Sequence, residues 1–223
     1  MKISKFILLL VLLITLACNK DDNFSPGNNC LRGQGTIVSE TRTLSNFHSI
    51  NNTIFADILL TQGPQEDVMI EAQQNILEEV KTEVINGELR ITHNRCLDIV
   101  DPVILHVTIP EIENLTLTGV GDIIAQNEFD LADLKITLTG AGNFDLQGIA
   151  TSLDIRLTGV GNVSAFDLNA DVCNVSISGV GDVEVFVNDE LNVTITGVGT
   201  VSYIGNPTIT SNISGSGGIV NSN

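Results

Sequence analysis

The sequence predicts an all-β fold, a parallel β-helix (solenoid) with coils of about 20 residues, and three observations support this prediction. Apolar and polar residues alternate in many segments, as in Leu115-Thr116-Leu117-Thr118, which is typical of a strand with one buried face. A Gly-x-Gly pair follows several of these segments at a nearly constant spacing. The chain is 43% hydrophobic and only 17% charged, and its polar residues are mostly Thr, Ser, Asn and Asp, which suit strands and turns.

The Gly-x-Gly pairs define the repeat. Their first glycines are separated by 21, 19, 20 and 18 residues, and the segment SNISGSGGI adds a degenerate copy 18 residues further on. This period indicates stacked units, and such a coil has a circuit of roughly 60 Å, which encloses side chains alone. Leucine-rich repeats share the period, but their helical half and fixed Asn or Cys are absent. The pairs are Gly119 and Gly121, Gly140 and Gly142, Gly159 and Gly161, Gly179 and Gly181, and Gly197 and Gly199.

Stacking in register predicts columns of equivalent residues, one from each coil. Three columns should point inward: Leu134, Leu153, Cys173 and Leu191; Ile136, Ile155, Val175 and Val193; and Leu138, Leu157, Ile177 and Ile195. One column between them should point outward: Thr137, Arg156, Ser176 and Thr194. The glycines should turn the corner of each coil, because they permit positive φ angles and a close approach of neighbouring coils.

The corners carry two further expectations. The residue inside each pair should point inward, that is Val120, Ala141, Val160, Val180 and Val198. The polar residue after each pair should bond nearby backbone amides of the turns, that is Asp122, Asn143, Asn162, Asp182 and Thr200. Two chemical interpretations fit less well. A dinucleotide site requires GxGxxG before a helix, and a calcium β-roll, in which Asp122 or Asp182 would bind the ion, has a nine-residue period.

The first half of the chain lacks the glycine pairs but is also rich in predicted strands. We expect these strands within residues 47–63, 67–73, 87–93 and 102–110. A short helix is predicted from Asn75 to Val84, because the apolar residues of this segment share one helical face. We therefore predict one β-helix domain over residues 35–223. Irregular N-terminal coils at 35–114 would cap the stack, and Gly-x-Gly repeats would follow at 115–218.

The segments FHSINNTIFADILLTQG, PVILHVTIP and LTLTGVGDI, followed by the Gly-x-Gly repeats, resemble the auto-transporter adhesin head GIN domain family. The resemblance covers roughly residues 40–215. It implies a right-handed β-helix carried by secreted or lipid-anchored bacterial proteins. It supplies no catalytic residues.

The N-terminus is predicted to be a lipoprotein signal peptide over residues 1–17. Basic Lys2 and Lys5 precede an apolar run of eleven residues, which is too short to span a bilayer. The run ends at Ala17-Cys18, which resembles a lipobox with Cys18 as the lipidated residue, although Thr15 replaces the usual Leu. The alternative is an ordinary signal peptide with an incidental cysteine.

Residues 18–34 are predicted to be a flexible tether. Within it, Lys20, Asp21 and Asp22 resemble the surface-export tag of some Gram-negative lipoproteins. These features predict a lipid-anchored protein of the outer membrane, exposed at the cell surface. In the alternative, the three residues are plain tether and the domain faces the periplasm.

Charge and cysteine content restrict the partners. A net charge of −17 argues against nucleic acid, whose phosphates require Lys and Arg. Among the four cysteines, Cys173 should be a buried thiol, while Cys30 and Cys96 could form a disulfide or remain unpaired. His93, Cys96 and His106 have zinc-like spacing, but the two histidines alternate with apolar residues as surface residues do, so no metal site or cofactor is predicted.

We predict a non-catalytic role in binding, adhesion or scaffolding, with a glycan or protein ligand. A polysaccharide-active enzyme is the alternative, but the acids Asp145, Asp154, Asp167 and Glu184 do not cluster at equivalent coil positions. Phe144 and Phe166 should point inward, which leaves Tyr203 as the candidate exposed aromatic. The oligomeric state does not follow from the sequence, although an open end from Ile213 to Asn223 could allow end-to-end pairing.

Overall fold

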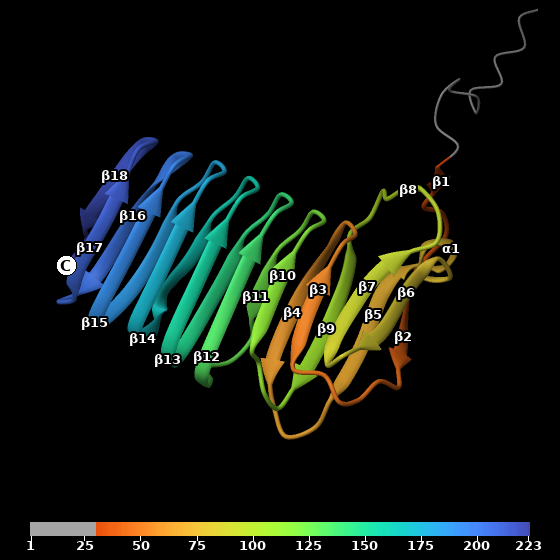
Figure 1. Cartoon of the computed structure of the whole chain (residues 1–223). Helices are drawn as coiled ribbons and strands as arrows, with labels where there is room; N and C mark the ends of the chain where they lie inside the picture. The colour runs from red at the N-terminus through yellow and green to blue at the C-terminus, as the bar shows by residue number, and fades with distance from the viewer. Residues whose placement is uncertain (1–29) are drawn as a thin grey trace, which may run out of the picture.

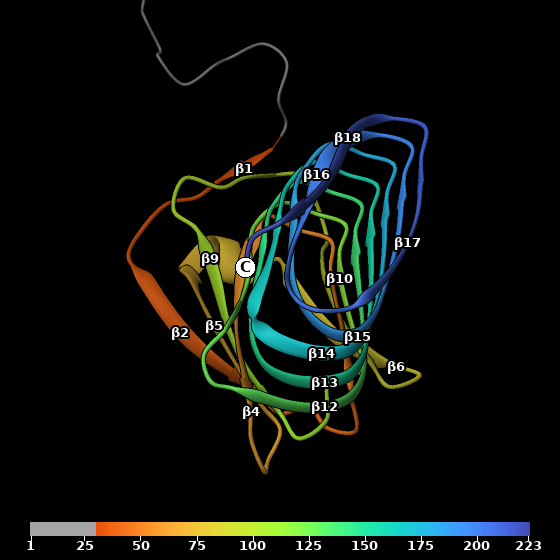
Figure 2. The same ribbon diagram turned by 90° about the vertical axis from the view of Figure 1, so that its left-hand side faces the viewer.

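The computed structural model describes residues 30–223, and most of this part of the chain is β-strand. The strands stack into an elongated body (Figure 1), and a view from its C-terminal end shows the chain winding around one interior (Figure 2). In Figure 1 the chain rises along the front, crosses the top and descends behind while advancing toward the C-terminus, so the coil is right-handed. The predicted parallel β-helix with coils of about 20 residues is confirmed.

Each regular coil has three faces, and the long strands bend from one face to the next. The first face rises toward the Gly-x-Gly corner, the second descends from it, and the third closes the coil below. The strands of the regular coils are β10 (Asn114–Leu117), β11 (Ile123–Ala125), β12 (Phe129–Leu138), β13 (Phe144–Leu157), β14 (Val163–Ile177), β15 (Val183–Ile195), β16 (Val198–Gly205), β17 (Thr208–Ile213) and β18 (Ser216–Asn221). Each of them pairs in parallel with the equivalent strand of a neighbouring coil.

The register of the first face confirms the predicted columns. Leu134, Leu153, Cys173 and Leu191 are aligned from coil to coil, as are the members of the two other inward columns. All twelve side chains are buried, with at most 3% exposed. The outward column of Thr137, Arg156, Ser176 and Thr194 is also in register. The core is therefore a set of stacked aliphatic rows, which bury apolar surface equally in every coil.

The N-terminal coils do not follow the order of the sequence. One coil contains β3 (Ser49–Asn52) and β4 (Ala56–Gln62), and another contains β7 (Glu88–His93) and β9 (Val103–Ile109). β3 pairs with β7 on one side and β10 on the other, and β4 lies in the same way between β9 and β11. The later β7–β9 coil thus lies outside the earlier β3–β4 coil. Residues 110–113 then carry the chain past the β3–β4 coil to β10, and we call this segment the crossover.

Antiparallel strands cap the N-terminal end of the stack. β6 (Val80–Ile85) pairs with β7, while β5 (Asp67–Gln73) pairs with β9, and β2 (Ile37–Arg42) pairs with β5. The predicted helix from Asn75 to Val84 is wrong beyond its first turn, because α1 spans only Gln74–Leu77 and Val80 begins a strand. Pairing with the open edge of β7 satisfies more backbone groups than a short helix would, so tertiary context overrides the helical pattern.

A disulfide closes the N-terminal segment onto this end. Cys30 and Cys96 are bonded, and their Cα atoms are 4.5 Å apart. The short parallel pair of β1 (Leu31–Arg32) and β8 (Leu97–Asp98) lies beside the bond. The chain that precedes Cys30 therefore joins the stack at the end opposite the C-terminus (Figure 1).

Candidate functional site

The predicted lipid site and export tag cannot be placed. Cys18 and the residues Lys20, Asp21 and Asp22 lie outside the described residues 30–223, so their roles stay predictions. Over the described part of the chain, no helix has the length and apolar character needed to cross a membrane.

The Gly-x-Gly pairs form the corner between the first and second faces, and the backbones of neighbouring coils touch there. At Gly161, φ is +147°, and an added Cβ would overlap the carbonyl oxygen of Gly142 in the preceding coil. The Gly161 N–H donates to the Val180 carbonyl at 3.0 Å, which links the corner to the following coil. The pairs are architectural, because this close approach excludes any Cβ.

The residues inside the pairs point outward, so the expectation that they point inward is wrong. Val120, Val160, Val180 and Val198 are between 47% and 58% exposed. The interior beside the corner is already filled by the buried residues that flank it, such as Leu138 and Phe144. Successive corners are joined by parallel bridges into one exposed row, which we call the apolar ridge: Phe55, Val120, Ala141, Val160, Val180 and Val198.

Beside the apolar ridge runs a ladder of polar side chains. Asn143 Oδ1 accepts from the Asn162 backbone N–H at 3.1 Å, and Asn162 Oδ1 accepts from the Asp182 N–H at 3.0 Å. The same bond recurs from Asp57 through Asp122 to Asn143 and from Asp182 to Thr200. Asp122, Asn143, Asn162 and Asp182 therefore bond nearby backbone amides of the turns, as expected, and each amide belongs to the next coil. We call this row the polar ladder.

The ladder also reveals a copy of the repeat that the sequence analysis missed. Ile50 pairs with Leu115 and Ile58 with Ile123, so residues 50–58 (INNTIFADI) are equivalent to LTLTGVGDI. Ile54 and Ala56 occupy the glycine positions. Their side chains are tolerated because the neighbouring coil on the N-terminal side has no Gly-x-Gly corner. Gly119, by contrast, has the Ile54 carbonyl against it, so it has no room for a side chain. The aspartate at the ladder position, Asp57, was the signal that could have identified this copy.

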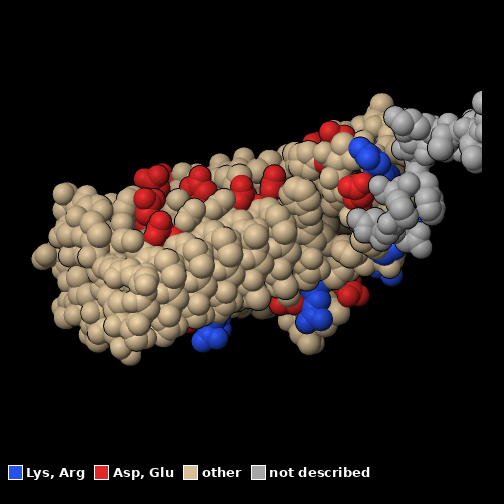
Figure 3. Space-filling model, turned by 90° about the horizontal axis from the view of Figure 1, so that it is seen from above, with Lys and Arg blue, Asp and Glu red and all other residues tan. Residues whose placement is uncertain are grey.

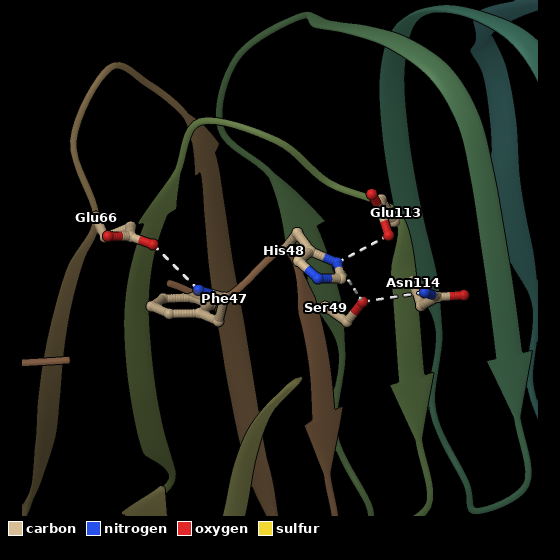
Figure 4. A network of polar contacts seen from close by, with 6 residues as sticks. All are labelled: Phe47, His48, Ser49, Glu66, Glu113 and Asn114. Carbon is tan, nitrogen blue, oxygen red and sulfur yellow. Dashed lines mark hydrogen bonds and ion pairs between the residues drawn. The ribbon is translucent and has the colours of Figure 1, made fainter. Parts of the chain in front are cut away.

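A cluster near the crossover resembles a Ser-His-Glu triad in composition (Figure 4). His48 Nδ1 lies 2.8 Å from Glu113 Oε2 and 3.3 Å from Ser49 Oγ. In a triad, the carboxylate and the nucleophile contact different ring nitrogens, so this geometry does not activate the serine. The Asn114 amide donates to Ser49 Oγ, and the Glu113 N–H donates to the His48 carbonyl at 2.8 Å. The cluster fastens the crossover to the start of β3.

An acidic groove of about 840 Å³ lies between the crossover and the third face. Gln62 joins its two sides, because its Nε2 donates to the Pro110 and Asp130 carbonyls at 3.1 Å each. The lining contains one basic residue, Lys135, and several carboxylates: Glu111, Glu113, Asp130, Asp133 and Asp154.

The remaining candidates do not assemble into a site. Cys96 is in the disulfide and His93 is exposed, and residues 30–223 hold no metal-like group of three ligands. The expectation that the four acids lie at different coil positions is wrong for Asp145 and Glu184, which share one outward column with Ser164 between them. It holds for Asp154 and Asp167, which lie at other coil positions. Over the described chain, acidic residues line one long edge of the face seen in Figure 3.

The aromatic predictions are mixed. Phe144 is buried, as expected. The prediction that Phe166 points inward is wrong: Phe166 is half-buried, because Val163 and Ala165 take the inward positions of this alternating strand. Tyr203 is half-buried against the core, so it is not a free aromatic platform.

The fold and its surfaces define a class of extended β-helical heads that present repeated rows of side chains. The family described as "Putative auto-transporter adhesin, head GIN domain" matches residues 46–207. The chain belongs to this family. No curated protein matches the chain.

Solved structures show the same fold. The chain is similar to a "putative adhesin" from Bacteroides fragilis, with a TM-score of 0.71 and 23% identity over 86% of this chain and 99% of the other. It is also similar to a "Putative lipid binding protein" from Parabacteroides distasonis, with a TM-score of 0.57 and 22% identity over 86% and 99% of the two chains. The family match indicates an adhesin-like domain of the cell envelope, and the solved structures show its fold.

Proposed function

We propose that this protein is a non-catalytic surface lipoprotein whose β-helix head binds glycans or proteins. Lipid on Cys18 would hold it in the outer membrane, and Lys20-Asp21-Asp22 would direct it to the cell surface. The observation that carries the proposal is the apolar ridge with its flanking rows. A row of exposed hydroxyls lies on one side of the ridge, Thr118, Thr139, Thr158, Ser178 and Thr196, and the polar ladder lies on the other.

This corner suits adhesion because it repeats the same contact. Neighbouring coils present one apolar, one hydroxyl and one amide or carboxylate group about 4.8 Å apart, the spacing of paired strands. Each group binds weakly by itself, but a ligand that touches several coils gains from every contact. Exposed apolar rows bordered by polar groups are also a common feature of interaction surfaces.

A catalytic role has less support. The Ser49, His48 and Glu113 cluster has the wrong geometry for a triad, and its contacts hold the crossover. The carboxylates of the acidic groove come from the crossover, the third face and, at Asp154, the first face. The adhesin names of the family and its neighbours favour binding.

The test is a pair of acidic substitutions on the ridge, Val160→Asp with Val180→Asp. Both valines are exposed, so the fold should persist while the ridge loses its apolar character. Binding to glycan and host-protein arrays should fall sharply. Ile149→Asp, at a 54% exposed isoleucine of the third face, is the matched control and should bind as the wild type does. Equal binding by the ridge variant and the wild type would refute the proposed binding site.

A further inference from the structure

The C-terminal coil exposes the ends of the interior columns. Ile209 and Ile213 in β17 are in register with Leu191 and Ile195, which have no exposed surface. Yet Ile209 is 38% exposed and Ile213 is 40% exposed. Within residues 30–223, no strand pairs with the outer edges of β17 and β18. We call this surface the tip.

The tip also lacks the features that usually protect sheet edges. Exposed edge strands normally carry charges, proline or a covering segment, because their free N–H and C=O groups can pair with another chain. Residues 191–223 contain no Asp, Glu, Lys, Arg or His, and β17 and β18 contain no proline. In Figure 3, the left-hand end of the body is entirely tan, so no charged residue is visible on that face of the end.

The opposite end of the stack is protected. There, α1 and the antiparallel strands β2 and β6 cover the core, and Ile76, Leu77 and Val80 are each 2% exposed. The edge strand β2 carries the ion pair of Arg42 with Glu40, at 3.2 Å. The capped end is therefore covered and charged, whereas the tip is uncovered and uncharged.

From these observations we propose that the tip binds the tip of a second copy of this chain. The proposal rests on the proposed function, because it names a partner for the adhesive head. A second copy fits because the chain is acidic, with a net charge of −17, and two such chains repel each other except where one uncharged surface meets another. Equivalent tips give a closed two-fold contact, so the assembly stops at a dimer.

The geometry of such a contact follows from the last coil. β17 runs toward the Gly215–Gly217 corner and β18 runs away from it, and each strand has six residues. A two-fold axis through this corner places β17 of one copy on β18 of its partner in the antiparallel sense. The free backbone groups of both strands then pair, and Ile209 and Ile213 are covered. With twelve strand residues a side (six plus six), the interface is smaller than the usual 20–30 residues, so the dimer should be weak and concentration-dependent.

This contact would bridge two membranes. Nine strands of the first face lie in a row from β6 at the capped end to β17 at the tip. At about 4.8 Å between neighbouring strands, the distance between the two ends is roughly 38 Å. The chain leading to Cys18 leaves from Cys30 at the capped end. A tip-to-tip dimer therefore places the two anchored ends at opposite extremes of a rod.

Sedimentation velocity of the full chain in detergent tests the dimer. We expect a reversible monomer–dimer equilibrium for the wild type and for Ile149→Asp, which changes an isoleucine away from the tip that is even more exposed, at 54%. Ile209→Asp with Ile213→Asp should weaken dimerisation by at least about tenfold while circular dichroism keeps the strand signal. Added salt should strengthen the wild-type dimer, because it screens the repulsion between acidic bodies. A monomeric wild type, or an unchanged dimer in the tip variant, would overturn the proposal.

Vesicles carrying the lipidated full chain test the bridging. Wild-type vesicles should cluster, and vesicles with the tip variant should stay dispersed. A solution dimer without clustering would overturn the bridging geometry. The tip variant should still bind the arrays through its ridge. Array binding by the ridge variant therefore tests the proposed function, and vesicle clustering by the tip variant tests the dimer separately.

Discussion

The backbone N–H of Asn162 donates to Asn143 Oδ1 at 3.1 Å, across the boundary between two coils. The Asn162 Nδ2 group reaches the same oxygen at 3.3 Å, while Asn143 in turn donates to Asp122 at 2.9 Å. Asn143 therefore bonds the coil before it and the coil after it. The polar ladder adds side-chain bonds between the coils at the corner, where the Gly-x-Gly backbones are already hydrogen-bonded to each other.

Asn143→Ala should lower the free energy of unfolding by about 1–2 kcal/mol, because it removes side-chain bonds to both neighbouring coils. Asn174→Ala is the control, since the Asn174 side chain accepts from the Asn192 side chain and carries no backbone bond between coils. This control should change stability by less than about 0.5 kcal/mol. Urea denaturation measures both, and equal losses would show that the ladder adds nothing.

Gly161→Ala should be severely destabilising. The new Cβ would overlap the Gly142 carbonyl oxygen, and φ of +147° is unfavourable for alanine. The backbone cannot shift in one coil without disturbing the next, so we expect a loss of several kcal/mol, or insoluble protein. Gly218→Ala is the matched control, because a Cβ there meets no atom within 4 Å. A soluble Gly161→Ala protein with wild-type stability would contradict the close packing of the corners.

Cys173 should be unreactive in the folded protein. Burial, with a smaller contribution from the charge of Asp154, raises the pKa of its thiol well above the usual range, so no thiolate forms at pH 8. Alkylation followed by peptide mass spectrometry should leave Cys173 unmodified in buffer and modify it fully in guanidinium. Labelling of the native protein at the rate of a free thiol would place Cys173 outside the core column.

Removal of the Cys30–Cys96 bond should destabilise the capped end. The bond closes a loop with a sequence separation of 66, and such crosslinks typically contribute about 2–4 kcal/mol. Cys30→Ser with Cys96→Ser should therefore melt at a lower temperature and be cleaved by trypsin at Arg32 or Arg95. Wild-type protein treated with reductant should show the same shift. Identical melting with and without the bond would mean that the two-residue β1–β8 pair suffices.

The regular half of the fold could be predicted in detail. A constant period fixes the register, so Leu134, Leu153 and Leu191 had to fall into one column once the coils were recognised. The strands at 67–73 and 103–109 were also predictable, because alternation marks them directly.

The missed features depend on contacts between distant segments. The reversed order of the β3–β4 and β7–β9 coils leaves no local pattern, because either order buries the same faces. The outward direction of Val160 depends on how fully Leu138 and Phe144 fill the corner. The helix predicted at Asn75–Val84 failed because the edge of β7 required a partner strand.

Protease shaving of intact cells tests the central claim of surface display most directly. The wild type is compared with a variant in which Lys20, Asp21 and Asp22 are all alanine. The account predicts that protease removes the wild-type head from intact cells, while the variant is protected until the outer membrane is opened. Protection of both proteins on intact cells would place the domain inside the envelope and contradict the adhesive role.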